Sequence, residues 1–264
     1  MENVQQIIKK IKNTKPLVLN LTNFVTMDFV ANGLLAIGAA PIVCLCEDEI
    51  EELVKLSAVI YINIGTLNDN FIQLIKAAII FAKKYNKPIV FDPVGCGATN
   101  IRTKLAIDIA PNCEIIRGNA SEIMALGSVA FGTKGVESIH KTQDAAIVAT
   151  KIAQDTAATI IISGAMDYIT DGCNFKKSSF GSAMMANITG MGCALTAIVA
   201  ACLAVTNDAF LASVLGVEYF TLCGELVGQK NQQPGCFKSA FIDMLYSPDF
   251  DVMQKIILEN NNEI

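Results

Sequence analysis

The stretch that decides the fold is Asn187-Ile188-Thr189-Gly190-Met191-Gly192-Cys193-Ala194-Leu195-Thr196, which continues as Ala197-Ile198-Val199-Ala200-Ala201. It predicts a glycine-rich turn that opens directly into a helix too apolar to face water, because Gly190 and Gly192 permit backbone angles closed to other residues. The first N–H groups of a helix lack partners within the helix, and the macrodipole adds about half a positive charge there. The stretch therefore indicates an anion site, most often for phosphate, with Cys193 at its mouth, where a thiolate is favoured. A tight turn followed by close packing gives the same pattern, so the rest of the chain must decide.

Around this stretch, short apolar runs alternate with helical patterns. The predicted strands are Leu17–Leu21, Ile42–Leu45, Val59–Ile64, Ile89–Phe91, Cys113–Ile116 and Thr159–Ile162. The predicted helices are 2–13, Met27–Ile37, Glu47–Leu56, Asn70–Tyr85, 101–109, Thr142–Asp155, Ala209–Gln229, 238–246 and 249–260. Such alternation predicts an α/β fold with a mainly parallel sheet and right-handed crossovers. A hairpin turned at Asp171-Gly172, between Asp167–Asp171 and Cys173–Lys177, adds antiparallel strands at one edge. No linker or repeat interrupts the pattern, so we expect a single domain over residues 1–264.

The composition narrows the class of protein. The chain has 264 residues, 52% hydrophobic and 17% charged, with a net charge of −5. This charge disfavours nucleic acid as a partner. The longest apolar run, Cys193 to Val205, is shorter than the ~20 residues of a membrane span. The N-terminal segment lacks the features of a signal peptide, so we expect a cytoplasmic protein. Nine scattered cysteines without a CxxC pair, and the single histidine, His140, do not make a zinc site.

Polar residues follow the predicted strands at their carboxyl ends, where parallel sheets bind ligands. They are Asn20, Asn23, Gly65-Thr66, Asp92, Arg117, the Gly118-Asn119 pair and Ser163-Gly164. Asp92 and Glu122 fit a hydrated Mg²⁺, which takes one or two carboxylates plus substrate phosphates, and Arg117 fits phosphate oxygens. Each signal has a plainer interpretation: Asp92-Pro93 is a common strand-ending turn, and Glu122 can cap its helix after Asn119. Together with a phosphate-type turn downstream, the set favours ATP and magnesium.

The same residues resemble the hydroxyethylthiazole kinases of thiamine salvage, in the ribokinase-like superfamily, from about Pro16 to Phe237. The blocks that carry the resemblance are Asn20-Leu21-Thr22-Asn23-Phe24-Val25, residues 31–39, Asn63-Ile64-Gly65-Thr66-Leu67, residues 92–99, Arg117-Gly118-Asn119-Ala120-Ser121-Glu122 and Thr189-Gly190-Met191-Gly192-Cys193. The resemblance implies a three-layer ribokinase-like fold and ATP-dependent phosphorylation of the primary hydroxyl of 4-methyl-5-(2-hydroxyethyl)thiazole. It also implies a homotrimer with active sites at subunit interfaces.

The resemblance also implies individual roles. Cys193 falls at the position of the general base. Arg117, Ser163 and Asn119 fall on the ATP side, and Asp92 and Glu122 on the magnesium side. Asn23, Val43 and Gly190 fall at positions lining the thiazole pocket. Val43 stands where the family usually has methionine, and Leu19, Ala165 and Met191 also depart from its usual residues.

Three other readings remain open at this point. One is a ribokinase-like kinase of another vitamin-precursor alcohol, such as hydroxymethylpyrimidine. The second is a non-catalytic nucleotide-binding regulator, which the intact Asp92, Glu122 and Cys193 disfavour. The third, a hydrolase using Cys193 with His140, lacks a group to orient the histidine.

Overall fold

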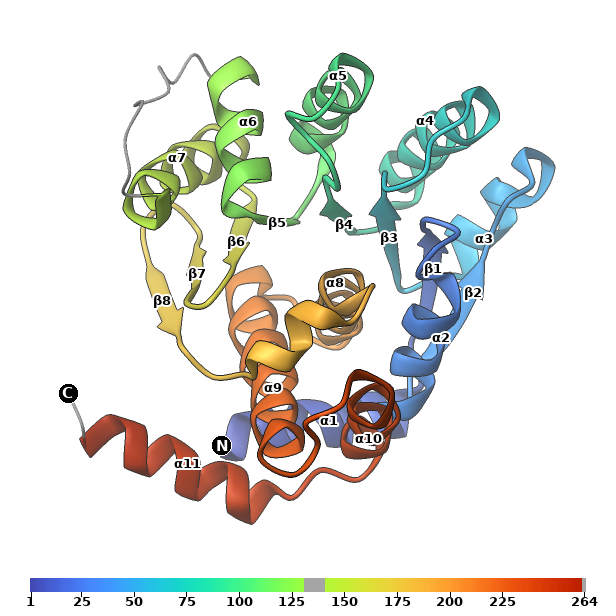
Figure 1. Ribbon diagram of the computed structural model, residues 1–264. Coiled ribbons are helices and arrows are strands. Elements are labelled where there is room, and N and C mark those ends of the chain that lie inside the picture. Colours follow the sequence, from blue (N-terminus) through green and yellow to red (C-terminus); the bar gives the residue numbers. More distant parts are fainter. Residues whose placement is uncertain (131–140, 263–264) are drawn as a thin grey trace.

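The computed structural model describes residues 1–130 and 141–262, built around one eight-stranded sheet (Figure 1). The strands are β1 (Leu17–Leu21), β2 (Ala40–Val43), β3 (Val59–Asn63), β4 (Ile89–Asp92), β5 (Ile115–Asn119), β6 (Thr159–Ser163), β7 (Asp167–Thr170) and β8 (Phe175–Ser178). Their spatial order is β2-β1-β3-β4-β5-β6-β7-β8. The first six in this order run parallel, and β7 and β8 form an antiparallel hairpin at one edge.

Helices cover both faces of the sheet and make it the middle of three layers (Figure 1). One face carries α1 (Glu2–Thr14), α2 (Met27–Ala36), α8 (Met191–Leu203), α9 (Ala209–Lys230) and α10 (Pro234–Tyr246), with α11 (Phe250–Asn262) against α9. The other face carries α3 (Ile50–Leu56), α4 (Asp69–Tyr85), α5 (Asn100–Ile109), α6 (Ala120–Ala130) and α7 (Lys141–Thr156). Short 3₁₀ helices are η1 (Glu47–Glu49), η2 (Ala110–Asn112) and η3 (Ala183–Asn187).

The two-residue period of the strands divides their side chains between two apolar cores. In β3, Val59 and Tyr61 belong to the core beneath α8, whereas Ile60 and Ile62 belong to the core beneath α4. Because both faces are buried, the strands read as continuous apolar runs in the sequence. The helix α8 is buried from Ala194 to Leu203 and packs over the middle of the sheet. Its contacts with the sheet are mainly with β3, β4 and β1.

The predicted fold class is confirmed: a mainly parallel sheet with helices on both faces and an antiparallel hairpin at one edge. Several predicted boundaries differ from those of the structure, and two have a clear physical reason. The second strand lies at Ala40–Val43 instead of Ile42–Leu45, since β2 is an edge strand and its Pro41 needs no ladder partner for the missing N–H. Residues 117–119, which lie outside the predicted strand Cys113–Ile116, end β5, because they pair with Ile161–Ser163 of β6.

The helix α9 is long and apolar enough to cross a membrane by length and composition. Most of its apolar stretch is buried inside the molecule, against α8, α10 and α1. This burial is typical of the central helix of a globular core.

Candidate active site

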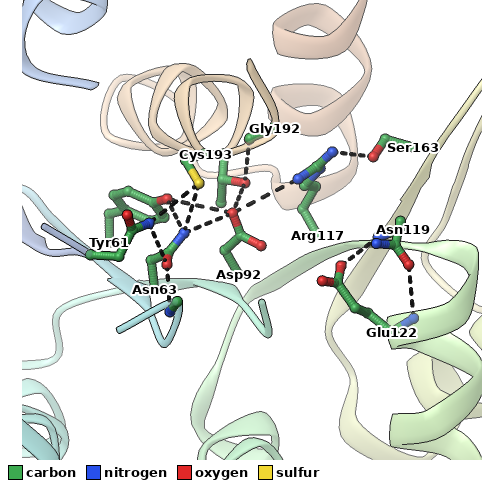
Figure 2. A network of polar contacts seen from close by, with 12 residues as sticks. Tyr61, Asn63, Asp92, Arg117, Asn119, Glu122, Ser163, Gly192 and Cys193 are labelled. Carbon is green, nitrogen blue, oxygen red and sulfur yellow. Dashed lines mark hydrogen bonds and ion pairs between the residues drawn. The ribbon is translucent and has the colours of Figure 1, made fainter. Parts of the chain in front are cut away.

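Strand alternation brings four polar positions onto the α8 face. Tyr61, Val90, Ile115 and Ile161 lie in the core beneath α8. The residues two positions later in the same strands therefore face α8 as well. These residues are Asn63, Asp92, Arg117 and Ser163. Each one ends its strand or stands near its end, so the polar groups meet at one edge of an otherwise apolar layer (Figure 2).

The turn before α8 uses its two glycines differently. Gly190 is the N-cap residue with φ +95°, a conformation that favours glycine, and a Cβ there would lie 2.9 Å from Cγ2 of Thr26. Gly192 lies inside α8 and does not have a positive φ, so its predicted role in the turn is wrong. Instead it provides space, because a Cβ at Gly192 would overlap the guanidinium of Arg117. The guanidinium thus lies directly against the first turn of α8.

Asp92 is the centre of a buried polar network (Figure 2). Its Oδ2 accepts hydrogen bonds from Nδ2 of Asn63 at 3.0 Å, Oγ1 of Thr196 at 3.1 Å and the hydroxyl of Tyr61 at 3.5 Å. Nη1 of Arg117 lies 3.8 Å from the same oxygen. Within the described part of the chain, Oδ1 of Asp92 is buried without a hydrogen-bond partner. Burial raises the pKa of Asp92 to about 6, although Arg117 opposes the shift.

Cys193 lies in the first turn of α8 with its sulphur directed at two carboxamides. Nδ2 of Asn63 is 3.2 Å from Sγ, and Nδ2 of Asn23 is 3.5 Å from it. The pKa of the Cys193 thiol is raised, mainly by burial and then by the charge of Asp92. The predicted lowering of this pKa by the helix terminus is therefore wrong, because burial and the neighbouring carboxylate outweigh the dipole.

A cavity of about 780 Å³ opens on the other side of the first turn of α8. Arg117, Asn119, Ser163 and Gly190 line it, together with the β6–β7 loop and η3. Nη2 of Arg117 donates a hydrogen bond to Oγ of Ser163 (Figure 2). Nε of Arg117 is buried without a partner among the described residues. A guanidinium with spare donors, beside a helix N-terminus, makes this end of the cavity an anion site.

Asp167 places a carboxyl group in the same cavity. It is 4% exposed, and its Oδ1 accepts a hydrogen bond from the backbone N–H of Gly164 at 3.1 Å. Burial raises the pKa of Asp167 to about 6. The cavity therefore holds the positive guanidinium of Arg117 and the carboxyl group of Asp167, whose pKa is about 6.

Glu122 both caps a helix and joins the site. Its Oε2 accepts from the backbone N–H of Asn119 at 2.9 Å, while Oδ1 of Asn119 accepts from the N–H of Glu122 at 3.0 Å (Figure 2). This reciprocal pair is a capping box. Oε1 of Glu122 accepts from the N–H of Gly95 at 2.9 Å, which ties the loop after β4 to α6. The capping interpretation of Glu122 is thus correct, and its charge still acts on Asp92.

Other predicted residues lie apart from the cavity. Val43 ends β2 opposite Asn20 of β1 and is half-buried, away from the residues that line the cavity. Asn23 points at Asn63 and Cys193. His140 lies outside the described residues. Within the described ranges, groups of three or more acidic, Cys or His side chains suited to a metal ion are absent.

Sequence reasoning missed four residues of this region: Tyr61, Asn63, Thr196 and Asp167. The signals were an amide at the end of an apolar strand, a hydroxyl inside an apolar helix and a carboxylate at the start of the first hairpin strand. Polar residues at positions that the periodicity marks as buried need partners. Here Tyr61, Asn63 and Thr196 share Asp92 as a partner, and Asp167 pairs with the backbone N–H of Gly164.

Comparison with known proteins agrees with this geometry. The model of the hydroxyethylthiazole kinase family matches residues 8–249. A hydroxyethylthiazole kinase from Chlamydia abortus is 45% identical over 257 residues, 97% of this chain and 98% of that protein. The solved hydroxyethylthiazole kinase of Pyrococcus horikoshii has a TM-score of 0.89 and 32% identity, covering 96% of each chain. A ribokinase-like superfamily protein from Enterococcus faecalis has a TM-score of 0.67 at 14% identity, covering 89% of this chain and 88% of that one, and it shows the shared fold alone.

Proposed function

Because the chain belongs to the hydroxyethylthiazole kinase family, we propose that its strand-end site transfers the γ-phosphoryl group of ATP to the primary hydroxyl of 4-methyl-5-(2-hydroxyethyl)thiazole. The enzyme is a kinase, and its activity is phosphorylation of hydroxyethylthiazole in thiamine biosynthesis. The finer assignments below are proposals about how this chain performs that activity. They include one kinase domain over residues 1–264 and a cytoplasmic location.

The observation that carries the proposal is the position of the first turn of α8. On one side of it lies a cavity with Arg117 and Ser163, and on the other lies the sulphur of Cys193. Phosphoryl transfer requires a phosphate donor and an acceptor hydroxyl held in line, with charge neutralised between them. A helix N-terminus between the two groups of residues meets this requirement.

The nucleotide belongs in the open cavity. Arg117 is already oriented by Ser163, and its buried Nε still needs an acceptor, which a phosphate oxygen supplies. The unpaired N–H groups at the N-terminus of α8, together with the helix dipole, stabilise the transferred phosphoryl group. Asn119 lines the same cavity and is a proposed nucleotide contact.

We place magnesium at the carboxylates of Asp92 and Glu122. Oδ1 of Asp92 is buried and lacks a hydrogen-bond partner among the described residues. Burial of an unpartnered carboxylate oxygen is unfavourable unless a ligand such as a metal ion supplies the partner. Asp92 and Glu122 together would hold the ion, and Mg²⁺ in such sites keeps waters and phosphate oxygens as its other ligands. When bound, Mg²⁺ neutralises the charge of the phosphates.

Cys193 is the proposed general base. The hydroxyl oxygen of the substrate bonds to the γ-phosphorus, the bond from that phosphorus to the bridging oxygen breaks, and ADP leaves with the bond electrons. The hydroxyl proton passes to Sγ of Cys193. A raised thiol pKa makes the sulphur a stronger base once ionised, but it lowers the thiolate fraction at neutral pH.

The thiazole belongs beside Cys193, with Asn23, Gly190 and Val43 as its proposed contacts. Val43 is on the edge strand β2, where Phe24, Val25 and Leu45 of the neighbouring loops are exposed. A second subunit would cover this edge, so we propose a homotrimer with shared sites. Light scattering on the purified protein checks this assembly, and a fully active monomer would contradict it.

The direct experiment combines the purified chain with Mg-ATP and either hydroxyethylthiazole or hydroxymethylpyrimidine. We expect ADP and phosphorylated thiazole in equal amounts, and much slower turnover of the pyrimidine. Faster turnover of hydroxymethylpyrimidine than of hydroxyethylthiazole would make the pyrimidine alcohol the proposed substrate instead. ATP consumption that is independent of either alcohol would remove the acceptor assignment.

A further inference from the structure

Cys193 presents its sulphur to hydrogen-bond donors. Nδ2 of Asn63 and Nδ2 of Asn23 both lie within hydrogen-bond distance of Sγ, at 3.2 Å and 3.5 Å. An amide nitrogen donates and does not accept. The sulphur is therefore held as an acceptor on this side, which is the state that a proton-accepting thiolate requires.

The orientation of the Asn63 carboxamide is fixed by its neighbours. Its Oδ1 accepts from the backbone N–H of Gly65 at 2.9 Å and from Nδ2 of Asn23 at 2.9 Å. A backbone N–H can pair only with an acceptor, so exchange of the amide oxygen and nitrogen would place a donor against a donor. Nδ2 of Asn63 must then face Tyr61, Asp92 and Cys193.

Asn63 thus lies between the two groups with proposed roles. Its nitrogen is 3.0 Å from Oδ2 of Asp92 and 3.2 Å from Sγ of Cys193, and the side chain is fully buried. An ionised sulphur beside a carboxylate in a buried site is unfavourable without donors. A hydrogen bond to a charged acceptor favours the thiolate by roughly 10-fold or more.

We propose that Asn63 is a positioning residue for the reaction, which acts through Cys193 by holding its sulphur as a hydrogen-bond acceptor. The inference rests on the proposed function, in which Cys193 takes the hydroxyl proton. The inference requires that a substitution of Asn63 lowers kcat only while the sulphur of Cys193 is present. A residue that only supports the fold would lower kcat equally without the sulphur.

A double-mutant cycle tests this dependence. We expect Asn63→Ala to lower kcat about 10-fold with KM for ATP and for thiazole within about twofold. In a Cys193→Ala background, the same change should lower kcat by less than about twofold, because the sulphur it acts on is gone. An equal loss in both backgrounds would assign Asn63 to Asp92 or to the fold and overturn the proposal.

Asn20 is the matched control. It is an equally buried asparagine on the adjacent strand β1, but its Nδ2 donates to the carbonyls of Val18 and Ile42. Any effect of Asn20→Ala on kcat should be the same with and without the Cys193 sulphur. If Asn63→Ala does not fold, Asn63→Ser, which removes Nδ2 without adding a charge, takes its place in the cycle.

Thiol reactivity gives a readout besides turnover. Because the thiolate is the species that reacts, we expect labelling of Cys193 by iodoacetamide, followed on its own peptide at pH 8, to slow about 10-fold in Asn63→Ala. Unchanged or faster labelling contradicts the proposal. Wild-type kcat in Cys193→Ala alone would instead overturn the general-base assignment, so the two failures are distinguishable.

Discussion

The two sides of the first turn of α8 contain similar residue types in opposite arrangements. On one side, Tyr61, Asn63, Asp92, Thr196 and Cys193 bond to one another and form what we call the closed cluster. On the other side, Arg117, Asn119, Ser163 and Asp167 line what we call the open cavity. Each side holds one buried carboxyl group whose pKa burial raises to about 6.

The difference indicates that the closed cluster serves the chemical step and the open cavity serves nucleotide binding. Groups in the closed cluster are oriented before any ligand arrives, as a site for chemistry requires. Groups of the open cavity keep unused donors and free volume, as a binding site requires. Changes in the closed cluster should therefore lower kcat, and changes in the open cavity should raise KM for the nucleotide.

The largest effect should follow Asp92→Asn in the closed cluster. We expect kcat to fall about 100- to 1000-fold, the loss that follows removal of one preorganised electrostatic group. The Mg²⁺ concentration needed for half-maximal rate should rise, with KM for thiazole little changed. Steady-state kinetics over a magnesium series measures both. Normal turnover at limiting Mg²⁺ would refute the metal assignment. The control for the Mg²⁺ requirement is Asn63→Ala, which alters the same network without removing a charge.

Cys193 should give the next largest effect. We expect Cys193→Ala to lower kcat about 10- to 100-fold, at or below the floor for general-base catalysis, since a loose transition state asks less of the base. Substrate affinity should be nearly unchanged. Cys193→Asp should retain activity, because a carboxylate serves as the same proton acceptor. A Cys193→Asp protein that folds and binds both substrates without turnover would remove residue 193 from the mechanism.

How much of this comparison the sequence predicts depends on the kind of contact. Periodicity placed Asp92, Arg117 and Ser163 near strand ends, and parallel strands bring their carboxyl ends together. It did not predict that Asn63 pairs with Asp92, because that requires the register of β3 against β4, which non-local contacts set. The end of β5 was missed for the same reason, since pairing with β6 overrides the polar composition of residues 117–119.

The pKa of Cys193 was mispredicted because the sequence reports a helix terminus but not burial. The turn gives the local field, which favours a thiolate. The tertiary structure adds desolvation and the charge of Asp92, which disfavour it. Local chemistry was therefore readable from the sequence, and its long-range modification was not.

Arg117 tests the open cavity. We expect Arg117→Lys to raise KM for ATP about 10-fold, because lysine cannot reproduce the fork that bonds Ser163 and a phosphate at the same time. KM for thiazole should stay within about twofold and kcat should fall less than it does in Cys193→Ala. A change in kcat alone would assign Arg117 to the closed cluster, where its 3.8 Å contact with Asp92 lies.

The smallest expected effect concerns the carboxyl group of the open cavity. A carboxyl whose pKa rises from 3.8 to about 6 on folding binds its proton more tightly in the folded state. Its contribution to stability is therefore fully present below pH 4 and is lost as the pH rises through 6. Between pH 5 and pH 7 this loss amounts to about 1 kcal/mol for one such group.

Asp167→Asn removes the titration and keeps an acceptor for the N–H of Gly164. We expect the difference in Tm between pH 5 and pH 7 to change by roughly 2–4 °C relative to wild type, in the direction of a more stable variant at pH 7. Thermal melts without nucleotide at both pH values measure this, and groups that titrate in both proteins cancel in the comparison. If the variant has the same pH dependence as wild type, Asp167 is ionised at both pH values and the cavity is wetter than its burial indicates.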